Sequence, residues 1–331
     1  MRRGCRVCTF GTGFPLRPFR PTRYDQLLRR AGNRDYPPAL RSSDSVLYAR
    51  LGLAQRSERA TLMLTKTASR AWYDPSARRL LLRRTPAAQR SAVLNELVRA
   101  LVDQNFNLRR LTGLYAHDRD RALAARGIVD GTAALASGLQ ARPVSGTQLE
   151  RFLSLESAAR LTGGRQLAAQ LRYLGGASAL ASALRTFPQT TEQLLHVDKF
   201  LERERALPVH LPKQIGNLRL TTAETFGELD LRSLLRTFHV GDSVAVAEGW
   251  GGGRLALYTS PSGDRRRACV ALGHTRGRGR MAERRSRVRG RRVPRRDRSR
   301  LPAARPVLVV GVDRGHGLAR RHSSPGKRTG V

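Results

Sequence analysis

Residues 94–108 read Leu94-Asn95-Glu96-Leu97-Val98-Arg99-Ala100-Leu101-Val102-Asp103-Gln104-Asn105-Phe106-Asn107-Leu108. The leucines and valine at positions 94, 97, 98 and 101 have the i, i+3, i+4, i+7 spacing of one face of a helix. Upstream, Thr85 can act as the N-cap, and Pro86 suits the first helical position because its fixed φ is helical. The sequence therefore predicts a helix from about residue 85 to Phe106, with its apolar face in a core.

A β-hairpin is predicted just before this helix. The runs 62–73 and 79–83 have strand character and flank Asp74-Pro75-Ser76. This tripeptide favours a turn, because Pro presets φ and Asp can accept hydrogen bonds from the backbone that follows it.

Helices dominate the rest of the chain. Asp118 to Leu135 is rich in Ala, and we expect Gly127 and Gly131 within it to allow close helix packing, since each costs about 1 kcal/mol relative to Ala. The tripeptide Gly251–Gly253 predicts a turn before a strand at 255–259. Further helices are predicted at 24–31, 45–53, 148–161, 166–174, 178–187, 226–239 and 242–250, and residues 190–201 are predicted as a short helix or a loop. The predicted class is α+β, mainly α.

The stretch 94–108 resembles the metal-binding helix of a gluzincin-like family of bacterial zinc metallopeptidases, His-Glu-x-x-His-Ala-Leu-x-Asp-Gln-x-Phe-x-Leu. Asn95 and Arg99 stand where the family has its two histidines, whereas Glu96 matches the family's general base. Asp130, within Val129-Asp130-Gly131, stands where the family has a third ligand, Glu. The matching positions are Glu96, Ala100, Leu101, Asp103, Gln104, Phe106 and Leu108.

Two other segments match the same family in the same order. They are Trp72-Tyr73-Asp74-Pro75 and Thr191-Glu192-Gln193-Leu194-Leu195-His196. The resemblance covers roughly residues 70–260 and implies a zincin-like helical domain with a small N-terminal β-hairpin or sheet. We therefore expect an Arg- and Pro-rich segment at 1–60, a metallopeptidase-like domain at 61–264 and an Arg-rich tail at 265–331.

The family's chemistry depends on residues that this chain lacks. In the family, imidazoles at i and i+4 hold zinc on one helical face, while the Glu takes a proton from metal-bound water. Here Arg99 would place a cation beside the metal, which costs roughly 8 kcal/mol at about 4 Å and an effective dielectric of about 20. We expect no zinc or other cofactor, a vestigial Glu96 and no peptidase activity. The expected role is binding or scaffolding, with a peptide or protein partner along the hairpin edge.

Arg99 has three interpretations. It can form an ion pair with Glu96, Asp103 or Asp130, it can lie on a solvated face, or it can bind an anion. A related alternative for the whole protein is an active metal hydrolase that uses the non-standard ligands Glu96, Asp103 and Asp130.

The Arg-rich tail raises a different function. Residues 265–331 hold 22 Lys and Arg against 3 Asp and Glu, about half of the chain's formal net charge of +37, and contain no Phe, Tyr or Trp. Three interpretations stay open: an arm that binds nucleic acid through its phosphates, a solvated disordered tail, and an artefact of translating GC-rich DNA in the wrong frame. The nucleic-acid alternative depends on this tail alone.

Other motifs are weak. No apolar run reaches 18 residues, so no transmembrane segment is predicted. No secretory signal is visible as written, although the resemblance implies an extracytoplasmic protein, so the compartment stays open. Cys5 and Cys8 lack the second pair that a structural zinc site needs.

Overall fold

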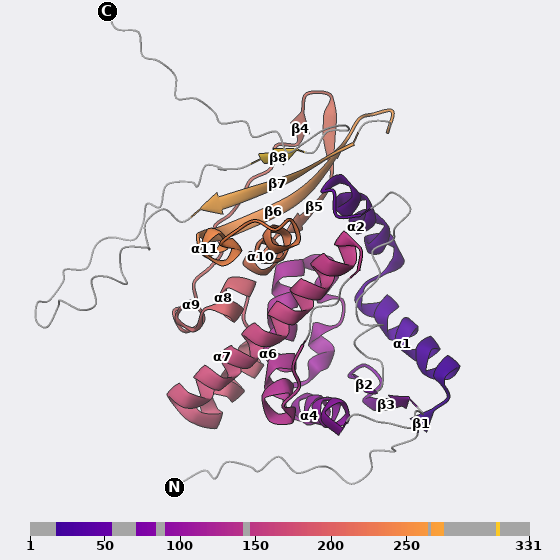
Figure 1. The fold of residues 1–331 in the computed structure, drawn as a ribbon, viewed down its shortest axis with the longest axis vertical. Coiled ribbons are helices and arrows are strands. Elements are labelled where there is room, and N and C mark those ends of the chain that lie inside the picture. The colour runs from indigo at the N-terminus through magenta and orange to yellow at the C-terminus, as the bar shows by residue number, and fades with distance from the viewer. Residues whose placement is uncertain are drawn as a thin grey trace, which may run out of the picture.

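The computed structural model describes residues 18–54, 71–83, 90–141, 146–263, 266–274 and 309–311. It is mainly helical with two small sheets (Figure 1), which is the predicted α+β class. The helices are α1 (Pro21–Asp35), α2 (Pro38–Arg50), α4 (Arg90–Phe106), the 3-10 helix η1 (Leu108–Leu111), α5 (Leu114–His117), α6 (Arg119–Ser137), α7 (Gln148–Thr186), α8 (Thr191–Leu195), α9 (Val197–Leu201), α10 (Glu228–Thr237) and α11 (Ser243–Glu248). The strands are β1 (Pro18–Phe19), β2 (Ala71–Asp74), β3 (Arg79–Arg83), β4 (Gln214–Ile215), β5 (Leu218–Thr225), β6 (Trp250–Thr259), β7 (Arg266–His274) and β8 (Val309–Gly311).

The predicted hairpin is present as β2 and β3, which pair antiparallel, and β1 adds in parallel to give the order β1-β3-β2. Asp74 Oδ1 accepts hydrogen bonds from the backbone N–H groups of Ser76 (3.0 Å) and Ala77 (3.3 Å), as its turn chemistry predicts. The first part of the predicted strand, residues 62–70, and the predicted caps Thr85 and Pro86 lie outside the described residues.

The N-terminal residues are part of the folded body. Tyr24 and Leu28 of α1 pack with Trp72 and Leu81 of the hairpin. Leu47 of α2 joins a second core that includes the C-terminal sheet. The expected separate segment at 1–60 is therefore corrected for residues 21–50, because the apolar faces of both helices are buried against the rest of the chain.

Glycines bring α6 and α7 into contact, as predicted for Gly127 and Gly131. A Cβ added at Gly131 would overlap the backbone of Gly164, and one added at Gly164 would overlap the carbonyl of Gly127. The predicted gap between the helices 148–161 and 166–174 is wrong, since α7 passes through Gly163 and Gly164 in helical conformation. The predicted gap between the helices 166–174 and 178–187 is confirmed, because the helix breaks at Gly175 and Gly176, where Gly176 has a φ of +64°.

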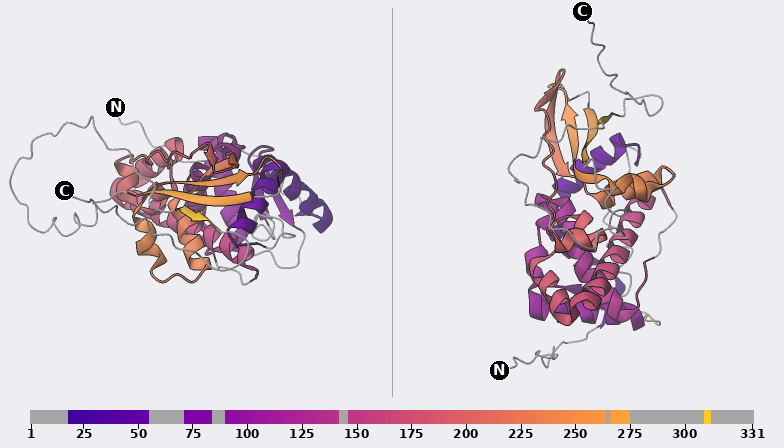
Figure 2. Two further views of the ribbon diagram at one scale, coloured as in Figure 1. Left: turned by 90° about the horizontal axis from the view of Figure 1, so that it is seen from above. Right: turned by 90° about the vertical axis from the view of Figure 1, so that its left-hand side faces the viewer.

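The five-stranded sheet has the order β4-β5-β6-β7-β8 and lies at one end of the molecule, with α4 toward the opposite end (Figures 1 and 2). The predicted turn at Gly251–Gly253 is wrong, because these glycines belong to β6. A Cβ at Gly252 would overlap the carbonyl oxygen of Leu207, and one at Gly253 that of Phe226. Glycine is needed here because two other chain segments approach the strand closely.

The strand β7 corrects the expected end of the folded domain at 264. It pairs with β6 along its length, and Ala268, Cys269 and Val270 are buried. The predicted boundary at 264 therefore falls inside the hairpin of β6 and β7. The sequence did not reveal this strand, because its apolar residues 268–272 are few in number and flanked by arginines. Residues 275–308 and 312–331 lie outside the described part. Among the described residues, no helix combines the length and apolar character needed to cross a bilayer.

Candidate functional site

Arg99 on α4 lies between two carboxylates that the resemblance predicts as its neighbours. Its Nη1 is 3.2 Å from Oδ1 of Asp130 on α6, and its Nε is 3.8 Å from Oε2 of Glu96. Asp103, the third partner considered, makes other contacts: it accepts hydrogen bonds from the Tyr73 hydroxyl (2.7 Å) and the Leu108 N–H (2.5 Å). The ion-pair interpretation of Arg99 is therefore confirmed for two of its three candidate partners.

Glu96 is buried and connects the helix to the hairpin. Its Oε2 accepts the backbone N–H of Tyr73 at 2.8 Å, and its Oε1 accepts the Asn95 amide at 3.1 Å. Burial raises the pKa of Glu96, and Arg99 opposes this shift. Both carboxylate oxygens thus have donors from the protein itself.

Asp130 is held by two guanidinium groups, those of Arg99 on α4 and Arg160 on α7. Burial disfavours the charged form of Asp130, but Arg99 and Arg160 together hold the pKa of this carboxyl below its ordinary value. Conversely, burial opposes the charge on Arg99, but Asp130 and Glu96 raise the pKa of that guanidinium. The cluster is therefore a set of charged ion pairs that joins three helices.

The residues at the family's ligand positions do not fit zinc. The Asn95 amide is hydrogen bonded on both sides, since its Nδ2 donates to Glu96 and its Oδ1 accepts from the Ser137 hydroxyl at 3.4 Å. Arg99 is a cation, and Asp130 is shared by two arginines. Within the described residues, no three His, Cys, Asp or Glu side chains are grouped to hold a metal. The alternative ligand set is not brought together either, because Asp103 faces Tyr73 and Leu108.

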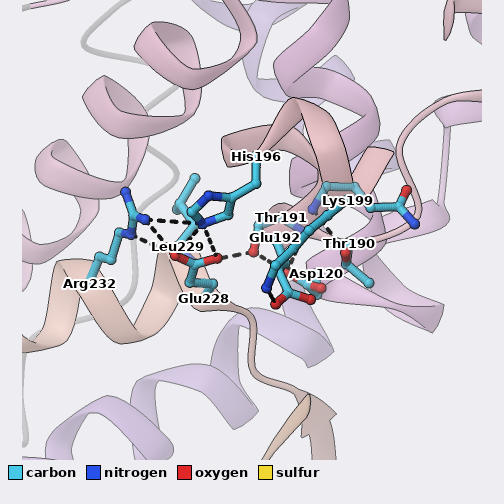
Figure 3. A network of polar contacts seen from close by, with 10 residues as sticks. Asp120, Thr190, Thr191, Glu192, His196, Lys199, Glu228, Leu229 and Arg232 are labelled. Atoms are coloured by element: carbon cyan, nitrogen blue, oxygen red, sulfur yellow. Dashed lines mark hydrogen bonds and ion pairs between the residues drawn. The ribbon is translucent and has the colours of Figure 1, made fainter. Parts of the chain in front are cut away.

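A second polar network surrounds the matched segment Thr191–His196 (Figure 3). Asp118, where the predicted helix 118–135 begins, is a typical N-cap residue, and it caps α6 by accepting the Arg121 N–H at 3.0 Å. Asp120 instead accepts the hydroxyl (2.5 Å) and backbone N–H (3.1 Å) of Thr191. This contact ties the first turn of α6 to α8.

His196 forms the other half of this network. Its Nε2 lies 3.0 and 3.1 Å from the two carboxylate oxygens of Glu228, which also binds Arg232 (Figure 3). Burial disfavours the charged imidazole, but the hydrogen bond to Glu228 raises the pKa of His196 overall. Within the described residues, the hydrogen-bond partners of this imidazole are Glu228 and Arg232, so the network fixes the end of α8 against α10.

Sequence reasoning missed a third cluster, centred on the buried Arg119. Arg119 pairs with Glu156 of α7 and with Asp230 of α10, the latter at 3.1 Å. Burial raises the pKa of Glu156 to about 7 and that of the nearby Glu224 to about 9. No local pattern marks these charges as buried, and the only signal was the charged run 118–120 at a helix start.

No family model, no curated protein and no solved structure matches this chain.

Proposed function

We propose that the chain is a metallopeptidase-like scaffold in which ion pairs centred on Arg99 replace the zinc site, and that it no longer cleaves peptides. One observation carries the proposal. The positions that match the family's ligands and general base, on α4 and α6, converge on a single cluster through the contacts of Arg99 with Glu96 and Asp130.

The chemistry of the cluster supports loss of catalysis. A zincin-type reaction needs a carboxylate free to take a proton from metal-bound water. Glu96 instead accepts from the Tyr73 backbone and the Asn95 side chain. Arg99 in turn neutralises part of the negative charge that a dication would require. In this proposal Glu96 is a positioning residue that fixes the hairpin to α4.

The remaining role is binding of a peptide or protein partner. β2 is an edge strand of its sheet among the described strands. The N–H of Tyr73 on that edge already donates to Glu96. A peptide strand added there would lose one main-chain hydrogen bond. We therefore place binding beside the ion pairs of Arg99 and not along the edge of β2.

The proposal is tested by restoring the ligands. The triple variant Asn95→His, Arg99→His, Asp130→Glu should bind close to one zinc ion per chain, measured by metal analysis after dialysis. The wild-type chain and the single variant Arg99→Gln, which removes the cation without adding a ligand, should retain none.

Two results would contradict the proposal. Stoichiometric zinc in the wild-type chain would favour an active metal hydrolase with non-standard ligands. A triple variant that keeps the wild-type circular dichroism spectrum but binds no zinc would show that the three positions do not form a metal site.

A further inference from the structure

A cavity of about 40 Å³ lies beside Arg99, on the side of the hairpin. Three arginines line it, Arg34 on α1, Arg99 on α4 and Arg126 on α6, together with Trp72. A water needs roughly 10–15 Å³ by the same kind of measure. The cavity therefore has room for a group of a few heavy atoms.

Two of the three arginines have unused donors. The Nε–H groups of Arg99 and Arg126 are buried and have no hydrogen-bond partner within the described part of the chain, since Oε2 of Glu96, at 3.8 Å from the Arg99 Nε, is too far for a hydrogen bond. Buried donors without an acceptor are rare and costly in folded proteins. An acceptor in the cavity that reached these Nε–H groups would be held by charge-assisted bonds.

The acidic residues of the cavity wall are already paired. Asp74 accepts two hydrogen bonds from Arg34, at 2.8 and 2.7 Å. Asp35 pairs with Arg126 at 3.3 Å. The lining holds three arginines and two aspartates, and the third arginine, Arg99, is paired with Asp130 and Glu96 outside the lining. A negatively charged acceptor is nevertheless favoured over a cation, because the donors that remain unused belong to guanidinium groups.

We propose that this cavity binds a carboxylate group between Arg99 and Arg126, with Trp72 as an apolar wall. A planar carboxylate matches the donor geometry of a guanidinium and the size of the cavity. The inference rests on the proposed function, because the site adjoins the lost metal position: a guanidinium would hold the carboxylate of a peptide end where relatives hold a metal. The two sources of this chemistry are a peptide C-terminus and a small free carboxylate.

Trp72 provides the measurement, since the chain has two tryptophans and the other, Trp250, lies in a different core. The indole N–H signals of the full chain are followed by NMR while acetate, a short peptide acid, the same peptide as its C-terminal amide, or inorganic phosphate is added at constant ionic strength. We expect saturable shifts of the Trp72 signal with acetate and the peptide acid, none with the amide, and no change at Trp250. Tighter binding of the peptide acid than of acetate identifies a peptide end as the source, and equal binding identifies a small carboxylate.

Two variants distinguish binding in this cavity from a general attraction of anions to the positively charged chain. Arg126→Gln should weaken acetate binding about tenfold or more, as loss of a charge-assisted hydrogen bond implies. Arg121→Gln makes the same charge change at an exposed position of the same helix and should bind as the wild type does. Each variant is used only if its circular dichroism spectrum is unchanged.

Several results overturn the inference: no saturable shift with acetate or the peptide acid, equal shifts with the amide, shifts with phosphate alone, or undiminished binding by Arg126→Gln. The zinc test is independent of these outcomes. A triple variant that binds zinc, together with a wild-type chain that binds no carboxylate, would retain the proposed function and reject only this site.

Discussion

Removing the charge of Arg99 while keeping its bulk, as in Arg99→Met, should destabilise the fold and measure how much the ion pairs of Arg99 contribute to stability. The change leaves Glu96 buried without its cation and leaves Asp130 with Arg160 alone. Removing one partner of a buried ion pair costs about 3–5 kcal/mol. Because Asp130 keeps Arg160, and because the Arg99 side chain is 19% exposed, we expect a smaller loss of about 2–3 kcal/mol.

The loss should depend on pH. Burial already raises the pKa of Glu96, and removing Arg99 raises it further, so in the variant this carboxyl is more easily protonated. A carboxyl whose pKa is raised on folding contributes stability at low pH that is lost as the pH rises. The stability difference between variant and wild type should therefore grow from pH 5 to pH 8.

The assay is urea unfolding followed by circular dichroism at several pH values, with thermal unfolding as a second measure. A loss of 2–3 kcal/mol corresponds to a fall in Tm of roughly 5–10 °C for a domain of this size. Arg121→Met, at an exposed position of α6, is the matched control. A change below about 0.5 kcal/mol, the range of ordinary surface substitutions, would refute the view that Arg99 holds the helices together.

Three further predictions follow from particular contacts. Gly164→Ala should destabilise by about 3 kcal/mol or more, because the new Cβ overlaps backbone that cannot move aside; Gly241→Ala, where no atom lies within 4 Å of the added Cβ, should change the free energy of unfolding little. Burial raises the pKa of Glu224 to about 9, so the folded state binds a proton that the unfolded state releases, and stability should fall between about pH 5 and pH 9; Glu224→Gln should flatten that dependence in unfolding titrations. Tyr73→Phe should cost about 1–2 kcal/mol in urea unfolding, because buried Asp103 loses a hydroxyl donor and keeps only a backbone N–H; an unchanged unfolding midpoint would contradict the role of that bond.

Part of the candidate site could be predicted because its rules are local or carried by a motif. The pairing of Arg99 with Glu96 depends on helical spacing, since the two residues are i and i+3. Its pairing with Asp130 was expected from the order of the matched motifs. The cavity was not predictable, because Arg34 and Arg126 stand in segments that carry no distinguishing pattern and meet Arg99 only in the folded chain.

The sequence alone determined the elements whose causes lie within a few residues: the Asp74 turn, the Asp118 cap, and the mainly helical class. Only the tertiary structure decided which charges are buried and which glycines lie in strands. Arg119 donates a hydrogen bond to Asp230, 111 residues away in the sequence. Glycine is required in β6 because the backbone of other chain segments passes too close for a Cβ atom. Such contacts depend on long-range packing, which neither spacing nor propensity specifies.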